Sequence, residues 1–424
     1  MAATLLRTGR GYNGPTQDGG AAPVRSGERV QELDVLRGVV LFAVFFLNMI
    51  DFAVDMSTDA QLAALPTAAL DQVLYEIAYW LVDDKSITLF AFLFGLGFEL
   101  QLRRMLARGA DFRRLYLRRL SFLLGLGLVH RTFFWTWDIL HVYALAGFAL
   151  FALRDVGSRA LLIGGALLTI AADPVFTLFL EYTGLGGWHG LPDPATDAVL
   201  LARQHLLVAG DYPAIVADFA RYDWVDSLLR GTLFDMFFFA LGRFMLGAWV
   251  GERGWFRDCR AYLPGFRRVL MLGLPVGLLG EGLARAIEIH SRGEALEWLG
   301  FGVHVTSLPV LAAGYAAAVV VAFATPLGRR LLAPFAHPGR MALTNYVSQS
   351  LLCGFVFSGV GPGLGLLGSI GVSAVIPIVI ALYALQVLAS RFWLERFRFG
   401  PLEWLWRGFT YGELPELRRP ASPA

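Results

Sequence analysis

Long apolar segments recur along the chain and are separated by short polar connections. A bilayer core is about 30 Å thick and a helix rises about 1.5 Å per residue, so about 20 apolar residues can cross it. Ten segments come near this length: 35–54, 86–102, 115–134, 139–153, 160–182, 233–250, 269–289, 301–323, 341–357 and 372–392. The pattern predicts an all-α, polytopic integral membrane helix bundle with about ten transmembrane helices.

Arginines are concentrated in every second connection. They are Arg103, Arg104, Arg108, Arg113 and Arg114 after the second span, Arg154 and Arg159 after the fourth, Arg253, Arg257, Arg260, Arg267 and Arg268 after the sixth, Arg329, Arg330 and Arg340 after the eighth, and Arg391, Arg396, Arg398 and Arg407 after the tenth. Cytoplasmic loops carry the excess of basic residues. We therefore expect both termini to be cytoplasmic, and the regular alternation supports the count of spans.

Composition supports the membrane assignment. Hydrophobic residues make up 56% of the 424 residues and charged residues only 17%, and the mean hydropathy is +0.56. These values exclude an ordinary soluble domain and make the lipid bilayer the first expected partner. A net charge of +2 does not indicate a nucleic-acid partner. Cys259 and Cys353 lie far apart, so we expect no disulfide framework.

The chain divides into one large domain and two tails. Residues 1–29 are rich in Gly, Ala, Thr and Arg without an apolar core, which predicts a disordered N-terminal tail. Residues 30–412 are expected to form a single transmembrane helical domain, and 413–424 a C-terminal tail. The bacterial cytoplasmic (inner) membrane is the expected location. The oligomeric state stays open, a homodimer included.

The third span carries the most informative polar residues. Arginines at 113, 114, 118 and 119 precede an uncharged run, which is followed by His130, Asp138 and His141. At about 100° per residue, the eleven-residue step from Arg119 to His130 is close to three turns, so both side chains project from one face. The spacing predicts a groove with a phosphate-binding cation at one end and a proton acceptor at the other. No metal site is expected.

Each of these residues also has a purely structural interpretation. The arginines can serve only as topology signals, and the histidines can be interfacial residues bonded to a carbonyl or to water. Asp138 follows Trp135 and Trp137 and can belong to an aromatic belt. Ionisable groups at membrane depth are nevertheless costly and are functional candidates by default.

Other segments leave alternatives open. Glu281, Arg285 and Glu288 recur at helical spacing and can form a packing ion pair or line the same cavity as the arginines and histidines above. The glycines of the second and third spans are expected at helix contacts. The connection 184–230 combines aromatic residues with carboxylates, which suits either a saccharide or a solvated loop.

Five motifs resemble one known family. They are Leu33-Asp34-x-Leu-Arg37-Gly38 with Asn48; Leu89-Phe-x-Phe-Leu-Phe-Gly95-x-Gly97; Trp137-Asp138-Ile-Leu-x-x-Tyr143-Ala after His130; Gly339-Arg-Met-Ala-Leu-Thr-Asn345-Tyr346-x-x-Gln349-Ser350; and Phe399-Gly-Pro-Leu-Glu403-Trp404-Leu-Trp406-Arg407-Gly-Phe-Thr410-Tyr411-Gly. Together they are similar to the YeiB-like family of bacterial polytopic proteins, whose C-terminal half is a domain of unknown function. The similarity assigns 230–412 to this YeiB-like part and makes 30–160 resemble transmembrane acyltransferases.

The resemblance implies acyl transfer from acetyl-CoA or another acyl-CoA. In the related heparan glucosaminide N-acetyltransferase and bacterial sugar O-acyltransferases, arginines hold the phosphates of CoA and a buried histidine assists the transfer. The residues implied for CoA binding here are Arg37, Arg114, Arg118 and Arg119. The O-acyltransferases carry a histidine where this chain has Asn48, so the catalytic base expected here is His130 or His141 instead. Asp138 would orient the imidazole, and the Asn48 amide would bind the oxyanion.

Three functions are compatible with these sequence features. The preferred one is an acyltransferase acting on a hydroxyl or amine of a saccharide, a lipid-linked glycan or a small metabolite. The second is a transporter or exporter of a small polar solute, with a proton relay through His130, Asp138 and Glu281. The third is a catalytically inactive scaffold, favoured by Asn48. An arginine groove that binds acyl-CoA would distinguish the enzyme from the carrier.

Overall fold

The computed structural model describes residues 30–107, 109, 111–183, 196–225, 228, 231–290 and 295–419. The predicted tail 1–29 and residues 184–195 of the long connection lie outside this part. In order, the elements are α1 (Gln31–Asp55), α2 (Asp59–Ala64), α3 (Ala68–Val82), α4 (Lys85–Ala107), α5 (Phe112–Phe133), α6 (Leu140–Ala152), α7 (Ser158–Thr183), α8 (Asp197–Ala209), α9 (Tyr212–Asp218), the π-helix η2 (Phe219–Val225), α11 (Thr232–Arg253), α12 (Leu263–His290), α13 (Ala295–Phe323), α14 (Pro326–Leu332), the 3-10 turn η3 (Ala333–Phe335), α15 (Ala336–Arg340), α16 (Ala342–Phe357), α17 (Val372–Arg396) and α18 (Pro401–Tyr411).

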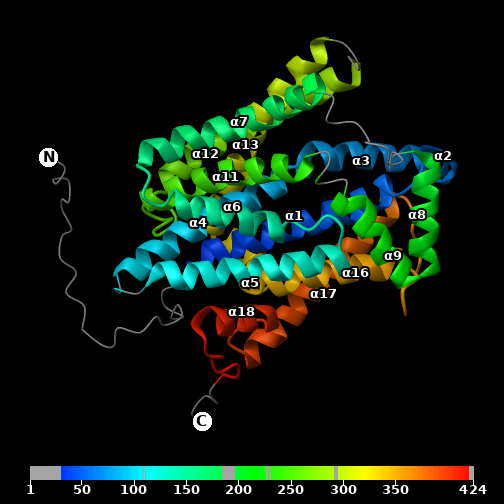
Figure 1. The fold of residues 1–424 in the computed structure, drawn as a ribbon. Helices are drawn as coiled ribbons and strands as arrows, with labels where there is room; N and C mark the ends of the chain where they lie inside the picture. The colour runs from blue at the N-terminus through cyan, green and yellow to red at the C-terminus, as the bar shows by residue number, and fades with distance from the viewer. Residues whose placement is uncertain are drawn as a thin grey trace.

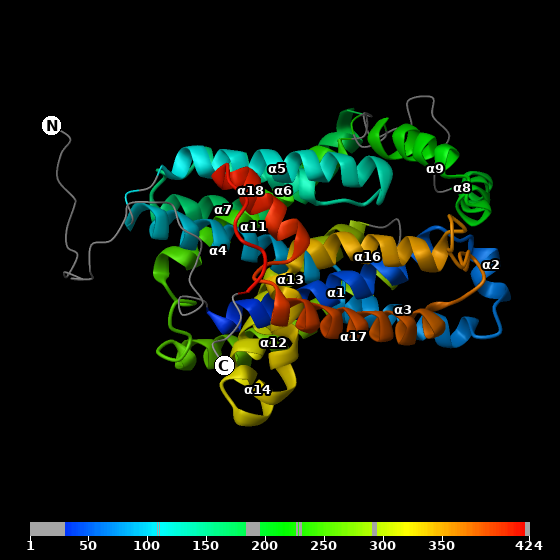
Figure 2. The ribbon, with the colours of Figure 1, turned by 90° about the horizontal axis from the view of Figure 1, so that it is seen from below.

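The long helices form a bundle with two distinct ends. The short helices α2, α8 and α9 gather at one end, on the right of Figures 1 and 2, and the end of α4 and the start of α5 lie at the other. Helix α18 packs across the outside of α5 and beside α16. Within the described residues no strand occurs beyond an isolated bridge between Phe397 and Arg418. The all-α class predicted from the sequence is therefore confirmed.

Among the described residues, six helices are long and apolar enough to cross a membrane: α1, α7, α11, α12, α13 and α17. Several of them carry large apolar side chains on their outer faces, including Leu167 at 61%, Leu272 at 68% and Leu279 at 75% exposure. Such a surface suits contact with lipid and not with water. The other four predicted spans also form helices, α4, α5, α6 and α16. Their crossing of the bilayer stays a prediction.

Glycines allow the closest helix contacts, as expected for a membrane bundle. A Cβ on Gly95 would collide with the backbone of Phe244, so α4 and α11 pack at backbone distance. A Cβ on Gly127 would collide with the backbone nitrogen of His141, which fixes α5 against the start of α6. The contact at Gly127 matters for the candidate site, because it positions His130 of α5 near His141 of α6.

The two C-terminal motifs bind each other through Glu403. Its carboxylate accepts hydrogen bonds from the backbone of Leu343 at 2.7 Å, from the backbone of Thr344 at 3.1 Å and from the Thr344 hydroxyl at 2.6 Å. These groups belong to the first turn of α16, where N–H groups have no partner within the helix. Burial raises the pKa of the Glu403 carboxyl above its usual value, although the bonds from Thr344 lower it. Glu403 therefore fastens α18 to the start of α16.

Replacing Glu403 with alanine is expected to destabilise the protein by about 2 kcal/mol or more, because three donors lose a charged acceptor. Thermal unfolding of the purified protein in detergent measures this loss. Glu395→Ala is the matched control, because Glu395 is half-exposed and only pairs with Arg391 on the same helix at 3.2 Å. Equal unfolding temperatures for the two variants would show that Glu403 does not hold α18.

Candidate functional site

A cavity of about 360 Å³ opens among α1, α4, α5, α16 and α18. Its polar lining is dominated by guanidinium groups, from Arg37, Arg104, Arg119, Arg340 and Arg407, against the two carboxylates Asp34 and Glu403. The lining therefore has a surplus of three positive charges. We call this space the arginine cavity. Planar guanidinium groups bind phosphate oxygens by paired hydrogen bonds, so the cavity suits a phosphorylated ligand.

Two of the four predicted CoA-binding arginines line this cavity. Arg37 is half-buried, forms an ion pair with Asp34 at 3.4 Å and reaches over Gly97 of α4. The Arg119 guanidinium lies 3.7 Å from the centroid of the Trp406 ring, and the Trp406 indole N–H donates to the Arg119 carbonyl at 2.8 Å. Both side chains are thus positioned by the helices that enclose the cavity.

The other two predicted arginines do not line it. Arg114 is exposed near the start of α5, where its backbone N–H bonds to the Asp111 carboxylate at 3.2 Å. The Arg118 guanidinium packs over the Phe409 ring at 5.6 Å, on the outside of the junction between α5 and α18. Arg118 therefore contributes to the docking of α18.

Three other arginines line the cavity that the sequence did not predict as CoA-binding residues. Arg104 lies in the last turn of α4, Arg340 ends α15, and Arg407 lies on α18. Arg104 is more than 200 positions from the other two in the sequence, so only the packing of the helices brings the three together. The signal was nevertheless present, because Arg340 and Arg407 stand inside the two C-terminal motifs.

Aromatic side chains close the inner end of the arginine cavity. Phe90, Phe94, Tyr143 and Tyr346 line it there, together with Leu140. The Phe90 ring stacks on Tyr346 at 6.4 Å, and the Tyr143 hydroxyl donates to the Ile87 carbonyl at 3.2 Å. The cavity thus changes from charged at its outer part to apolar at its inner end.

His130, Asp138 and His141 form one buried cluster, as the sequence predicts they can. His130 Nδ1 lies 2.8 Å from Asp138 Oδ1, and His141 Nδ1 lies 2.9 Å from Asp138 Oδ2. The three side chains are at most 2% exposed. The backbone N–H of His141 also donates to Asp138 at 3.2 Å, which fixes the carboxylate at the start of α6. The interpretation of these residues as water-bonded interfacial groups does not fit this burial.

The shared carboxylate determines which ring nitrogens can react. An ionised carboxylate only accepts hydrogen bonds, so both Nδ1 atoms donate to Asp138, and in a neutral ring Nε2 keeps its lone pair. His130 Nε2 and His141 Nε2 are buried and have no hydrogen-bond partner among the described residues. Each imidazole therefore presents a free proton acceptor, held in orientation from its other side.

Tyr346 stands between this cluster and the arginine cavity. Its ring lines the cavity and lies 5.6 Å from the His130 ring, while its hydroxyl accepts a bond from the Ile139 backbone at 3.3 Å. Leu140, next to His141 in the chain, lines the cavity too. The expected continuous groove from arginine to imidazole is therefore divided by the Tyr346 ring, and His130 and His141 do not line it.

Asn48 is half-buried in the second half of α1 and does not line the arginine cavity. Among the described residues, no hydrogen bond joins it to the His130 cluster. One turn further on, Phe52 packs against Trp135 and Trp137, at 5.0 and 5.6 Å between ring centroids. The aromatic rings before Asp138 therefore serve the core packing of α1.

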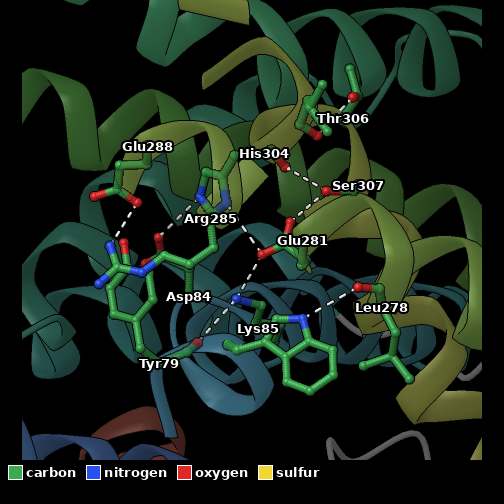
Figure 3. Close-up of polar contacts among 12 residues, drawn as sticks. Tyr79, Asp84, Lys85, Leu278, Glu281, Arg285, Glu288, His304, Thr306 and Ser307 are labelled. Carbon is green, nitrogen blue, oxygen red and sulfur yellow. Dashed lines mark hydrogen bonds and ion pairs between the residues drawn. The ribbon is translucent and has the colours of Figure 1, made fainter. Parts of the chain in front are cut away.

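A second group of charges lies near the start of α4 (Figure 3). Glu281, which the sequence grouped with Arg285 and Glu288, instead pairs with Lys85 at 2.7 Å and faces His304 at 3.2 Å. Arg285 pairs with Glu288 at 2.7 Å, as the helical spacing predicts. Lys85 and His304 were not predicted to take part, although Lys85 is the single lysine of the sequence. Glu281, Arg285 and Glu288 do not line the arginine cavity, so the expectation that they share it is wrong. No group of described residues has the arrangement of a metal site.

Both cysteines are free and buried, which confirms the prediction that they do not pair. Burial raises the pKa of the Cys259 thiol to about 12, so this thiol is unreactive at neutral pH.

Comparisons with known proteins identify the family. A family model described as "Protein of unknown function (DUF418)" matches residues 250–413. The chain is 31% identical to "Uncharacterized protein YxaH" of Bacillus subtilis (strain 168), over 92% of this chain and 96% of that protein. It is 30% identical to "Uncharacterized protein YeiB" of Escherichia coli (strain K12), over 90% and 96% of the two chains. The chain therefore belongs to the YeiB-like family.

Proposed function

We propose that the protein is a bacterial inner-membrane acyltransferase that moves an acetyl or other acyl group from cytoplasmic acyl-CoA to a hydroxyl or amine. The acceptor would be a saccharide, a lipid-linked glycan or a small metabolite. The observation that supports this best is the arginine cavity, one of whose lining residues, Tyr346, packs against the ring of His130, a buried imidazole with a free Nε2.

The proposal includes ten membrane spans with both termini in the cytoplasm. In this topology the end of α4 and the start of α5, with their arginines, face the cytoplasm, and α2, α8 and α9 lie outside. The arginine cavity then opens toward the compartment that contains acyl-CoA. The orientation follows from arginine placement, which the charges of the cavity itself reinforce.

In the proposed complex, Arg37 and Arg119 bind the phosphate groups of CoA, with Arg104, Arg340 and Arg407 nearby. The pantetheine arm would run along the aromatic inner wall and bring the thioester to Tyr346. A rotation of the Tyr346 ring, which has one hydrogen bond to the backbone of Ile139, would connect the thioester to His130. Such rotations of buried side chains occur on binding of a ligand.

His130 is the proposed general base. As the acceptor attacks the thioester carbonyl, its proton passes to Nε2 of His130, and the resulting imidazolium is stabilised by Asp138. Collapse of the tetrahedral intermediate breaks the bond to sulfur, and the proton returns to the departing thiolate of CoA. We assign no step to Asn48, because it does not line the cavity.

Binding of acetyl-CoA to the purified protein in lipid nanodiscs, measured by calorimetry, tests the proposal. Replacing Arg37 or Arg119 with glutamine should weaken binding about tenfold or more, because each removes charge-assisted hydrogen bonds to phosphate. Arg113→Gln is the matched control, because Arg113 is exposed on the same helix outside the cavity. Equal affinities in all three variants would reject the arginine cavity as the acyl-CoA site.

A transporter or exporter of a small polar solute is the second candidate. The buried Lys85 and Glu281, with the partly exposed His304 beside them, support it, because such charges at membrane depth often relay protons. His130 and Asp138 belong to a separate cluster from Glu281, so one relay through all three would need water between them. Solute flux driven by a pH gradient in proteoliposomes, without acetyl-CoA binding, would favour this function.

A further inference from the structure

Arg119 is held in the arginine cavity by an aromatic ring. Its guanidinium lies 3.7 Å from the centroid of the Trp406 ring, and its backbone carbonyl accepts a hydrogen bond from the Trp406 indole N–H at 2.8 Å. One side chain of α18 therefore holds both the charged group and the backbone of this residue of α5. Trp406 itself lines the cavity, and no step of the proposed acyl transfer uses it.

The aromatic ring leaves the N–H groups of Arg119 open to a ligand. A guanidinium carries five N–H donors in its plane, and a bidentate carboxylate partner would occupy two of them. The face of a tryptophan ring stabilises the same charge by cation–π attraction without taking these bonds. Within the described part of the chain, the Arg119 guanidinium has no hydrogen bond and no ion pair. It is therefore oriented and available to an anion.

Like charges around Arg119 make this support necessary. The guanidinium groups of Arg407 and Arg37 line the same cavity and repel that of Arg119. Arg37 has a carboxylate partner in Asp34 at 3.4 Å, whereas the Arg119 guanidinium has only the Trp406 ring among the described residues. A long side chain without support would turn away from its like-charged neighbours, and a ligand would then have to reorder it. Trp406 thus keeps Arg119 in place before a ligand arrives.

The same two helices carry a comparable contact outside the cavity. Helix α18 crosses α5 in Figure 2, and the Arg118 guanidinium there packs over the Phe409 ring at 5.6 Å. Neither Arg118 nor Phe409 lines the cavity. A general loosening of α18 and a specific loss of support for Arg119 can therefore be distinguished, because different aromatic residues of α18 are involved.

We propose that Trp406 is a positioning residue, which holds the Arg119 guanidinium so that its open N–H donors bind a phosphate group of the ligand. The identity of that ligand as acyl-CoA rests on the proposed function, whereas its phosphate chemistry rests on the cavity itself. The C-terminal motif that contains Trp406 thereby belongs to the ligand site and does not only pack against the bundle.

Calorimetric titration of acetyl-CoA, and separately of inorganic diphosphate, into the protein in lipid nanodiscs tests this role. Trp406→Leu should weaken the binding of both ligands about tenfold, because Arg119 loses its support. Trp406→Phe should weaken it only about threefold, because phenylalanine keeps an aromatic face and lacks the N–H donor. In the Arg119→Gln background, Trp406→Leu should change the affinity by less than about twofold, because Trp406 acts through Arg119.

Phe409→Leu is the matched control, because it removes an aromatic ring from the same helix, beneath the neighbouring arginine, outside the cavity. Both affinities should stay within about twofold in this variant. If Trp406→Leu does not fold, Trp406→Phe takes its place, and its threefold loss should likewise vanish in the Arg119→Gln background.

A loss in Trp406→Leu that exceeds the loss in Phe409→Leu and disappears in the Arg119→Gln background would support the role. Equal losses in the Trp406 and Phe409 variants would overturn it, and so would acetyl-CoA binding that does not depend on Trp406, which leaves the proposed function intact. Binding of diphosphate that depends on Trp406, without binding of acetyl-CoA, would keep the role and reject the proposed function. Absence of saturable binding of either ligand up to about 10 mM would overturn both.

Discussion

Replacing Asp138 with asparagine is expected to slow acyl transfer about a hundredfold or more, while the affinity for acetyl-CoA stays within about twofold. Asp138 accepts from Nδ1 of both His130 and His141, at 2.8 and 2.9 Å. An asparagine amide has a single carbonyl oxygen, so one imidazole must turn or change its tautomer. The His130 Nε2 atom then no longer presents its lone pair in a fixed direction, and the imidazolium loses its counter-charge.

Release of the CoA thiol from acetyl-CoA measures this rate, with glucosamine as the acceptor probe and with water alone. Asp155→Asn is the matched control, because Asp155 is 81% exposed beside Arg154 on the connection after α6. His130→Ala should reproduce the effect of Asp138→Asn. An unchanged thiol release in both cluster variants would remove the His130 cluster from the mechanism, even if acetyl-CoA still binds.

Replacing Lys85 with methionine is expected to destabilise the protein by about 3–5 kcal/mol, because the buried Glu281 carboxylate loses its nearest counter-charge and keeps only His304 and Ser307 as partners. The two side chains are almost fully buried, and the ammonium also holds the Tyr79 carbonyl. The double variant Lys85→Met/Glu281→Gln removes both charges and should recover at least 1 kcal/mol of the loss. Such recovery is the signature of a coupled buried pair.

Unfolding in detergent, followed by the loss of helical signal, measures both variants. Arg391→Met is the control, because its ion pair with Glu395 is 61% and 50% exposed and is expected to contribute well below about 1 kcal/mol. A loss for Lys85→Met no larger than for Arg391→Met would show that the pair does not stabilise the bundle. A double variant no more stable than Lys85→Met alone would contradict the coupling.

The apolar pattern predicted the positions of the long helices, because each of its ten segments reflects a local property of the chain. Every one of them is a helix in the structure, and six meet the length and hydropathy of a membrane span. The other four are interrupted by charge or are short, and two of them carry arginines of the cavity, Arg104 on α4 and Arg119 on α5. Residues that build a site thus weaken the very signal that identifies a span.

The candidate site was predictable only where its residues are close in sequence. His130, Asp138 and His141 lie within twelve positions, at the end of one predicted span and the start of the next, and the structure brings these two ends together. The arginine cavity, and the group formed by Lys85, Glu281 and His304, instead join residues up to several hundred positions apart. Their assembly depends on the packing of whole helices, which periodicity does not encode.

The central claim is that acyl-CoA binds in the arginine cavity with its thioester toward His130. A density map of the protein purified with acetyl-CoA tests it most directly. We predict that the phosphates lie between Arg37 and Arg119 and that the thioester reaches the Tyr346 ring. Acetyl-CoA density elsewhere on the protein, or an arginine cavity filled by lipid while saturating acetyl-CoA is present, would contradict the account.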